Sequence, residues 1–172
     1  MSSSLIEVKL VFISCLIIFA MVQTTTAQQT FDEKMESLYK HTVPLINVDE
    51  LESKLSANPI ILDIRSPKEF DVSHIQGAQL INYENFKKSD VKSIDKNQEV
   101  IVYCSVGYRS ERIGEKLQNM GFKNVKNLYG GIFDWKNNGK IIVNNKSAST
   151  DSVHTYNEDW SQWLYKGVKV YE

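Results

Sequence analysis

The sequence predicts an α/β fold with a mainly parallel central sheet and helices on both faces. Apolar runs without polar alternation, such as Ile60–Ile64 and Val100–Tyr103, are typical of parallel strands that are covered on both sides. Segments with apolar residues at helical spacing lie between these runs, and strands that alternate with helices build layered α/β domains. The 172 residues, with a net charge of −1, fit one globular domain with additional segments at its ends.

The N-terminus has the pattern of a secretory signal peptide. An apolar run over Leu10–Val22 follows Lys9, and Thr25 and Ala27 stand at the positions that a signal peptidase reads. We therefore expect residues 1–27 to be removed and the mature protein to be exported, either to a periplasm or to the outside, with no membrane attachment after cleavage. The alternative is an uncleaved N-terminal anchor, although the apolar run is short for a membrane span.

An N-terminal helical extension is predicted over residues 28–42, because Phe31–Lys40 carries apolar residues at helical spacing. The main domain is expected to span residues 43–143. It begins with a short apolar strand over Val43–Ile46.

Two helix starts are marked by capping residues. Asn47 and Glu50 have the spacing of a capping box, and they precede a helix that ends before the strand Ile60–Ile64. Ser66 is placed to cap a second short helix, with Pro67 at its first position. The strand between these helices is expected to be central in the sheet.

The second half of the domain repeats the same alternation. A helix is expected from Arg109 to Gly121, followed by a strand over Val125–Leu128 and a helix that opens at Gly130 and Gly131.

Residues 144–172 are predicted to be a C-terminal extension that docks on the domain. After a short strand over Ile141–Val143 comes a polar loop over Asn144–Ser152, and a strand is expected over Val168–Tyr171. Large aromatic residues are rare in free tails, which favours docking. The apolar residues at helical spacing between the loop and this strand are Tyr156, Trp160, Trp163 and Leu164.

Cys104 is the candidate nucleophile, because it stands where a buried strand gives way to a helix. The first turn of a helix has N–H groups without partners and the positive end of the helix dipole, so it stabilises a thiolate. A cysteine that only packs is the alternative. Gly107, however, allows a tight turn that wraps consecutive N–H groups around one point, and packing does not require this.

Removal of the signal peptide would leave Cys104 as the one thiol of the mature chain, since the other cysteine is Cys15. A single cysteine forms no internal disulfide. In an oxidising compartment a lone thiol is a liability unless it is used, which favours a chemical role.

Three polar residues are expected to support the site without reacting. Asp63 and Arg65 lie at the end of a buried strand and are expected to brace the C-terminal edge of the sheet. His74 could act as a base with Asp63 as its orienting partner. A histidine among turn residues before Gly77 is more often a hydrogen-bonded structural residue, so we assign His74 that role.

Four stretches together resemble the rhodanese family of single-domain sulfurtransferases. They are Leu62–Arg65 with Glu69 and Phe70, His74–Ala78, Cys104–Ser110 and Gly130–Trp135. One departure is Gln76, where the family often has proline. The resemblance runs from Val43 to Gly139 and implies the rhodanese-like fold.

The resemblance also implies a reaction. Cys104 would attack the outer sulfur of thiosulfate or another sulfane donor and hold it as a persulfide, which cyanide or a thiol would then remove. The loop N–H groups and the Arg109 guanidinium suit the binding of an anionic donor. No metal and no organic cofactor is implied. The expected substrate-binding residues are Ser105, Val106, Gly107, Tyr108, Arg109 and Ser110.

Two other functions remain as alternatives. Cysteine-dependent phosphatases and arsenate reductases have five residues between their cysteine and arginine, whereas four separate Cys104 from Arg109. The shorter loop favours one sulfur atom over a phosphate. A catalytically idle rhodanese-like module used for binding usually lacks the cysteine. The absence of a basic excess argues against nucleic acid as a partner, and the pattern predicts no oligomeric state.

Overall fold

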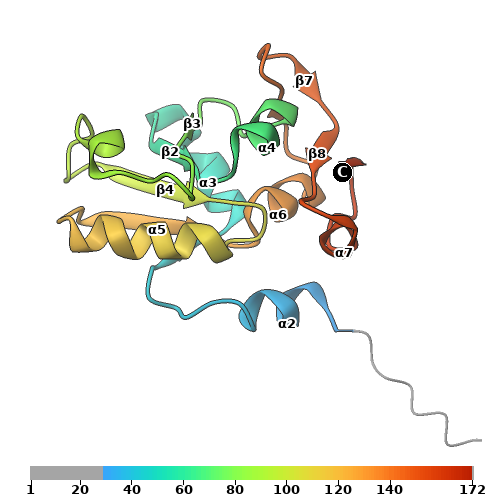
Figure 1. The fold of residues 1–172 in the computed structure, drawn as a ribbon, viewed down its shortest axis with the longest axis horizontal. Coiled ribbons are helices and arrows are strands. Elements are labelled where there is room, and N and C mark those ends of the chain that lie inside the picture. The colour runs from blue at the N-terminus through green and yellow to red at the C-terminus, as the bar shows by residue number, and fades with distance from the viewer. Residues whose placement is uncertain (1–28, 172) are drawn as a thin grey trace, which may run out of the picture. The chain divides into compact units, whose positions relative to one another are not determined.

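A five-stranded parallel sheet with the strand order β1-β5-β4-β2-β3 forms the centre of the fold (Figure 1). The strands are β1 (Leu45–Ile46), β2 (Ile60–Asp63), β3 (Gln79–Leu80), β4 (Glu99–Tyr103) and β5 (Asn124–Leu128). Every pairing between them is parallel, which confirms the predicted sheet. The computed structural model describes residues 29–171, so the predicted signal peptide, residues 1–27, lies outside the described residues.

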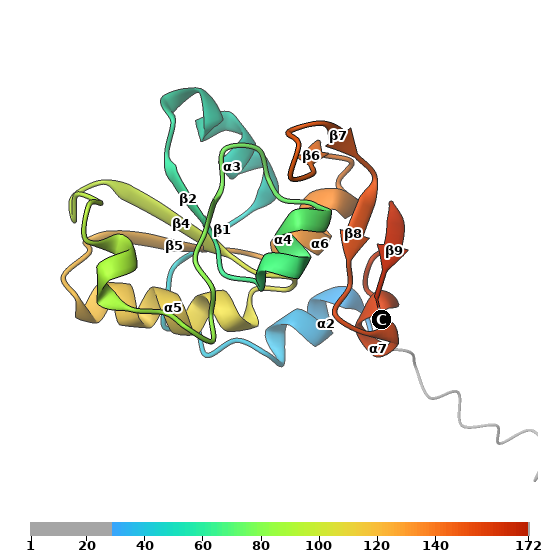
Figure 2. The same cartoon turned by 45° about the horizontal axis from the view of Figure 1, so that its top comes forward.

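Helices cover both faces of this sheet, as predicted (Figure 2). Apolar residues of α5 pack in one hydrophobic cluster, and those of α2, α3 and α6 pack in another. No helix within residues 29–171 is long and apolar enough to cross a membrane. The helices are α2 (Phe31–Glu36), α3 (Val48–Lys54), α4 (Pro67–Val72), α5 (Tyr108–Asn119), α6 (Gly131–Asn137) and α7 (Glu158–Ser161), with 3-10 turns η1 (Leu55–Ala57) and η2 (Lys88–Val91).

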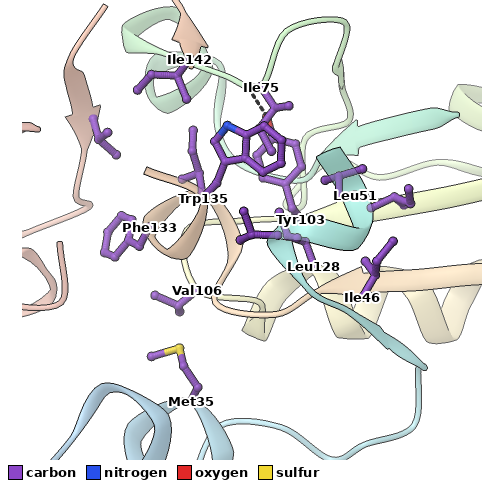
Figure 3. Close-up of a cluster of buried hydrophobic side chains, with 14 of the residues drawn as sticks. Met35, Ile46, Leu51, Ile75, Tyr103, Val106, Leu128, Phe133, Trp135 and Ile142 are labelled. Carbon is purple, nitrogen blue, oxygen red and sulfur yellow. Dashed lines mark hydrogen bonds between the residues drawn. The ribbon is translucent and has the colours of Figure 1, made fainter. Parts of the chain in front are cut away.

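Strand β4 contributes side chains to both clusters, because successive residues of a strand point to opposite faces. Val102 packs with the residues of α5, and Cys104 continues on the same side after the strand ends. Tyr103 packs in the other cluster, near Leu51 of α3 and Trp135 of α6 (Figure 3). Since β4 is the middle strand, Cys104 lies at the centre of the C-terminal edge of the sheet, where such folds bind ligands.

The predicted capping box at Asn47 and the predicted cap at Ser66 are confirmed. Asn47 Oδ1 accepts a hydrogen bond from the Glu50 backbone N–H at 2.8 Å, and Glu50 caps the Asn47 N–H in return. Ser66 and Glu69 form the same reciprocal pair at the start of α4, with Pro67 in the first helical position. These local signals fix where α3 and α4 begin.

The N-terminal helix is shorter than predicted and ends at Glu36 instead of Lys40. Tertiary hydrogen bonds replace those that the helix would have made. The Lys40 N–H donates to both carboxylate oxygens of Glu111 in α5, at 3.0 and 3.1 Å, and the Thr42 N–H also donates to this carboxylate.

The C-terminal segment also departs from the predicted pattern. The polar loop over Asn144–Ser152 contains β7 (Ser149–Thr150), which pairs antiparallel with β6 (Ile142–Val143). A second small sheet joins β8 (Ser152–His154) to β9 (Val168–Val170) in parallel.

The helix expected around Trp160 is restricted to α7, because Tyr156 has a left-handed φ of 67° and Asn157 caps the helix start. Val153, Trp163 and Leu164 are buried in the same cluster as Tyr103, so this segment contributes to the core of the domain.

Helix α6 begins against the loop that follows β4. Its Ile132 N–H donates to the Cys104 carbonyl at 2.9 Å, and its Phe133 N–H donates to the Ser105 carbonyl at 3.1 Å. Gly131 makes this approach possible: it has a φ of 56°, and a Cβ atom there would overlap the Cys104 carbonyl oxygen.

Gly131→Ala is therefore expected to destabilise the fold by about 3 kcal/mol, through backbone strain and the overlap with the loop. Gly77→Ala is the matched control, because Gly77 also has a positive φ, of 82°, but no heavy atom lies within 4 Å of its added Cβ. The control should cost only about 1 kcal/mol. Chemical denaturation of both variants measures the difference, and equal losses would contradict the close packing of α6 on the loop.

Candidate active site

Cys104 lies at the bottom of the loop between β4 and α5 and is 1% exposed. Its Sγ accepts a hydrogen bond from the Gly107 backbone N–H at 3.2 Å. Gly107 has the expected positive φ, of 92°, and α5 begins at Tyr108, one residue before the predicted position. The sulfur therefore lies within the turn that precedes the helix.

The carbonyl groups of this loop are held by the scaffold beneath it. Helix α6 binds the carbonyls of Cys104 and Ser105, as described above. The Tyr39 hydroxyl donates to the Val106 carbonyl at 2.7 Å, and Asn127 Nδ2 donates to the Gly107 carbonyl at 3.0 Å. Each carbonyl from Cys104 to Gly107 thus has a fixed partner.

This arrangement orients the N–H groups of the loop. A trans peptide is planar, so the N–H of each residue points opposite to the preceding carbonyl. Tyr39 holds the Val106 carbonyl, and the following N–H, that of Gly107, points to the sulfur. For the same reason, the N–H groups of Ser105, Val106 and Tyr108 point to the side of the loop opposite the groups that bind the preceding carbonyls.

Tyr39 and Ser110 act from below the loop. Burial raises the pKa of Tyr39 far above its ordinary value, so this phenol stays protonated and keeps donating to Val106. Its oxygen also accepts from the Gly130 N–H at 2.9 Å. The Ser110 hydroxyl is fully buried and donates to Asn127 Oδ1 at 2.7 Å. This hydrogen bond joins the first turn of α5 to β5.

Arg109 is paired with Glu69, a residue that the sequence analysis did not assign to the site. The guanidinium donates to both carboxylate oxygens, with Nη1–Oε2 at 3.0 Å and Nη2–Oε1 at 2.6 Å. The Ser105 hydroxyl bridges the pair, since it donates to Glu69 Oε1 and accepts from Arg109 Nη2, both at 3.1 Å. The capping box that Glu69 forms with Ser66 was the signal in the sequence that this carboxylate is held in place.

The charge of Glu69 is strongly stabilised. Burial alone would raise the pKa of this carboxyl, but the hydrogen bonds and the positive charge of Arg109 lower it to about 2. The pKa of Arg109 is raised in turn: burial would lower it, and the bond to Glu69 outweighs burial. The pair is therefore ionised at neutral pH.

Asp63 and Arg65 form a fully buried ion pair at the end of β2. Arg65 Nε donates to Asp63 Oδ1 at 2.9 Å, and Nη2 donates to Oδ2 at 2.6 Å. The Tyr103 hydroxyl donates to the same carboxylate at 2.6 Å and accepts from the Ile75 N–H. The pair links two strands and the loop before β3 and does not line the pocket described below.

His74 joins α4 to β6. Its Nδ1 lies 3.0 Å from the Phe70 carbonyl oxygen, and its ring stacks on that of Phe70 at 3.7 Å between centroids. Its backbone N–H and carbonyl both pair with Val143. These contacts give His74 a structural role, and it does not line the pocket described below.

A pocket of about 260 Å³ opens over Cys104. Three of its lining residues, Glu84, Tyr156 and Trp160, could not be predicted from the sequence, and the aromatic tail was the only indication of the last two. Gly107 and Ser110 support the loop without lining the pocket. Within residues 29–171, no group of three potential metal-ligating side chains lies close enough to hold a metal ion. The lining residues are Glu84, Cys104, Ser105, Val106, Tyr108, Arg109, Tyr156 and Trp160.

Comparison with known proteins places these features in a family. A family model described as a rhodanese-like domain matches residues 47–138. Among solved structures, the chain is similar to the rhodanese-like domain of an Anabaena sp. protein, with 26% identity, a TM-score of 0.54 and coverage of 59% of this chain and 79% of that one. It is also similar to a rhodanese-related protein from Thermoplasma volcanium, with 27% identity, a TM-score of 0.53 and coverage of 58% and 97%.

Curated relatives include two proteins named tRNA uridine(34) hydroxylase. The relative from Bacillus pumilus is 33% identical over 103 residues, which cover 57% of this chain and 31% of the relative. The relative from Streptococcus uberis is 34% identical over 108 residues, which cover 59% and 33%. The chain therefore spans about a third of the length of these relatives.

Glu69→Gln is expected to make the free energy of unfolding of this protein less dependent on pH in the acid range. The pKa of Glu69 falls from 4.5 to about 2 on folding, so its contribution to stability is complete above about pH 4.5 and is lost as the pH falls toward 2. This contribution is about 3 kcal/mol. The variant should be less stable than the wild type at neutral pH and lose less stability between these pH values.

Chemical denaturation over a series of pH values measures this difference. The matched control is Glu84→Gln, which removes a carboxylate from the same pocket and leaves the pair of Glu69 and Arg109 in place. A decline in Glu69→Gln as steep as in the wild type would show that the pair does not stabilise the fold.

Proposed function

Because the chain belongs to the rhodanese-like domain family, we propose that it is a sulfurtransferase in which Cys104 carries a sulfane sulfur from a small anionic donor, such as thiosulfate, to a thiol or cyanide. The observation that carries the proposal is the position of Cys104 Sγ, which receives the Gly107 N–H at 3.2 Å and lines the pocket. The oriented N–H groups of the loop suit a thiolate and the anionic persulfide that replaces it.

The reaction has two steps that need no outside oxidant or proton donor. In the first, the Cys104 thiolate forms a bond to the outer sulfur of thiosulfate, the bond between the two sulfur atoms breaks, and its electron pair leaves with sulfite. In the second, the acceptor thiolate or cyanide takes the outer sulfur of the persulfide, and the electron pair returns to Cys104. This division into two steps is covalent catalysis with ping-pong kinetics.

The alternative functions have less support. Four residues separate Cys104 from Arg109, one fewer than in the loops of cysteine-dependent phosphatases, and Arg109 is already paired with Glu69. The intact cysteine and the pocket above it do not favour an idle module. The named relatives carry their tRNA activity in proteins of which the matched region is about a third, and a net charge of −1 gives no basic excess for a polyanion.

Cys104→Ser is expected to abolish sulfur transfer without loss of the fold, because no other described residue of the pocket is a thiol. After incubation with thiosulfate, intact mass spectrometry should show one added sulfur atom on the wild-type protein and none on the variant. Cyanide should then remove the added sulfur as thiocyanate. Circular dichroism and denaturation curves of the variant establish that it is folded.

Two results would contradict the assignment. One is sulfur on the Cys104→Ser protein. The other is hydrolysis of an aryl phosphate by the wild type at a rate above that of sulfur transfer, which would replace the assignment with a phosphatase. Addition of tRNA to the same assay tests whether a polynucleotide is the acceptor.

We propose further that the protein is exported after cleavage behind Ala27, on the pattern of its first residues. Expression of the whole chain in a secreting bacterial host should give exported protein whose first residue is Gln28, as read by N-terminal sequencing. Ala27→Arg is the control, because a signal peptidase requires a small residue at that position, and it should leave the precursor uncleaved. A mature chain that begins at Cys15 would contradict this proposal.

A further inference from the structure

The outer wall of the pocket is aromatic and comes largely from the C-terminal segment. Tyr156 and Trp160 line the pocket together with Tyr108 at the start of α5. Tyr156 is 60% exposed, so packing of its own ring does not account for its place beside the reactive cysteine.

The backbone that carries this wall adopts a strained conformation at Tyr156. Tyr156 has a left-handed φ of 67°, a conformation that disfavours residues with a side chain. Its N–H donates to His154 Nδ1 at 3.1 Å. Asn157 Oδ1 accepts from the Trp160 N–H at 3.0 Å, and the Lys34 ammonium lies 5.4 Å from the centre of the Trp160 ring. A strained aromatic residue at a pocket mouth points to a contact with ligand.

The side chains that line the pocket carry no net positive charge. Arg109 is basic and Glu84 is acidic, so the formal charges of the described residues that line the pocket cancel. The Arg109 guanidinium is also bound by both oxygens of Glu69, and it lies 5.9 Å from the centre of the Tyr156 ring. Its remaining pull on a bound anion is therefore weak, whereas the aromatic wall can bury an apolar group.

We propose that the wall formed by Tyr156 and Trp160 selects organic sulfur donors that carry a flat aromatic group and a single negative charge. This inference rests on the proposed sulfur transfer and names the class of donor. The reacting group is the thiosulfonate type: the Cys104 thiolate bonds to the outer sulfur, the bond between the two sulfur atoms breaks, and its electron pair leaves with an aryl sulfinate. The aryl group of this leaving molecule packs against the two rings.

Two donors with the same reacting group and the same charge test the proposal. Benzenethiosulfonate carries an aromatic ring, and methanethiosulfonate carries a methyl group. We compare the ratio of their kcat/KM values in each variant with the ratio in the wild type, so intrinsic reactivity cancels. Tyr156→Ala and Trp160→Ala should each lower the preference for benzenethiosulfonate roughly three- to tenfold, since an aromatic contact of this kind is lost.

Conservative and control variants separate this effect from damage to the fold. Tyr156→Phe and Trp160→Phe retain a ring and should retain most of the preference. Tyr171→Ala removes an aromatic side chain from the same segment but outside the pocket, and its ratio should equal that of the wild type. A ratio unchanged in both alanine variants, with sulfur still transferred, overturns the inference and leaves the proposed function intact.

A binding measurement keeps the inference testable if no sulfur is transferred at all. Benzenesulfonate and methanesulfonate lack the transferable sulfur, and their affinities for Cys104→Ser can be measured by NMR titration. Benzenesulfonate should bind more tightly than methanesulfonate, and adding Trp160→Ala should remove this difference. That result supports the aromatic site even if the sulfurtransferase assignment fails. Equal affinities for the two sulfonates overturn the inference.

Discussion

The site depends on one constraint, which is that the carbonyl groups of the loop after β4 are all bound from beneath. Helix α6 binds those of Cys104 and Ser105, Tyr39 binds that of Val106, and a side chain of β5 binds that of Gly107. Planar trans peptides then leave the N–H groups on the other side. The cradle for an anion is thus a consequence of where the carbonyls are fixed, and it exists before any ligand binds, which is the condition for effective electrostatic stabilisation.

The carboxylate of Glu69 connects this loop to the rest of the sheet edge. It caps the first turn of α4 through Ser66, accepts from the Ser105 hydroxyl and holds Arg109 in a two-point ion pair. Because the pair is nearly buried, removal of one partner leaves an unpaired charge, which costs more than the pair itself contributes. Arg109 is therefore fixed in direction and partly neutralised, and its main contacts stabilise the loop.

The segments on either side of the matched family region both reach the active site. Tyr39 precedes residues 47–138 and supports the loop from below, while Tyr156 and Trp160 follow that region and wall the pocket from above. In the proposed reaction, Cys104 and its loop belong to the family domain, whereas Tyr156 and Trp160 of the pocket wall come from outside it.

The sequence by itself determined the elements whose causes are local. The capping boxes at Asn47 and Ser66, the apolar runs of β2 and β4 and the turn at Gly107 each depend on residues a few positions apart, so the order of elements and the location of Cys104 could be predicted. Only the tertiary structure decided that the N-terminal helix stops at Glu36 and that α7 is a single short turn. After α2, the backbone N–H groups of Lys40 and Thr42 bind Glu111 of α5. After α7, the Trp163 carbonyl and the Tyr165 N–H bind Asn137 of α6, so distant residues decide where the chain leaves each helix. Glu69, the carboxylate partner of Arg109, lies 40 positions before it, and Tyr156 and Trp160 lie more than 40 positions after it, and no local periodicity carries information on such contacts.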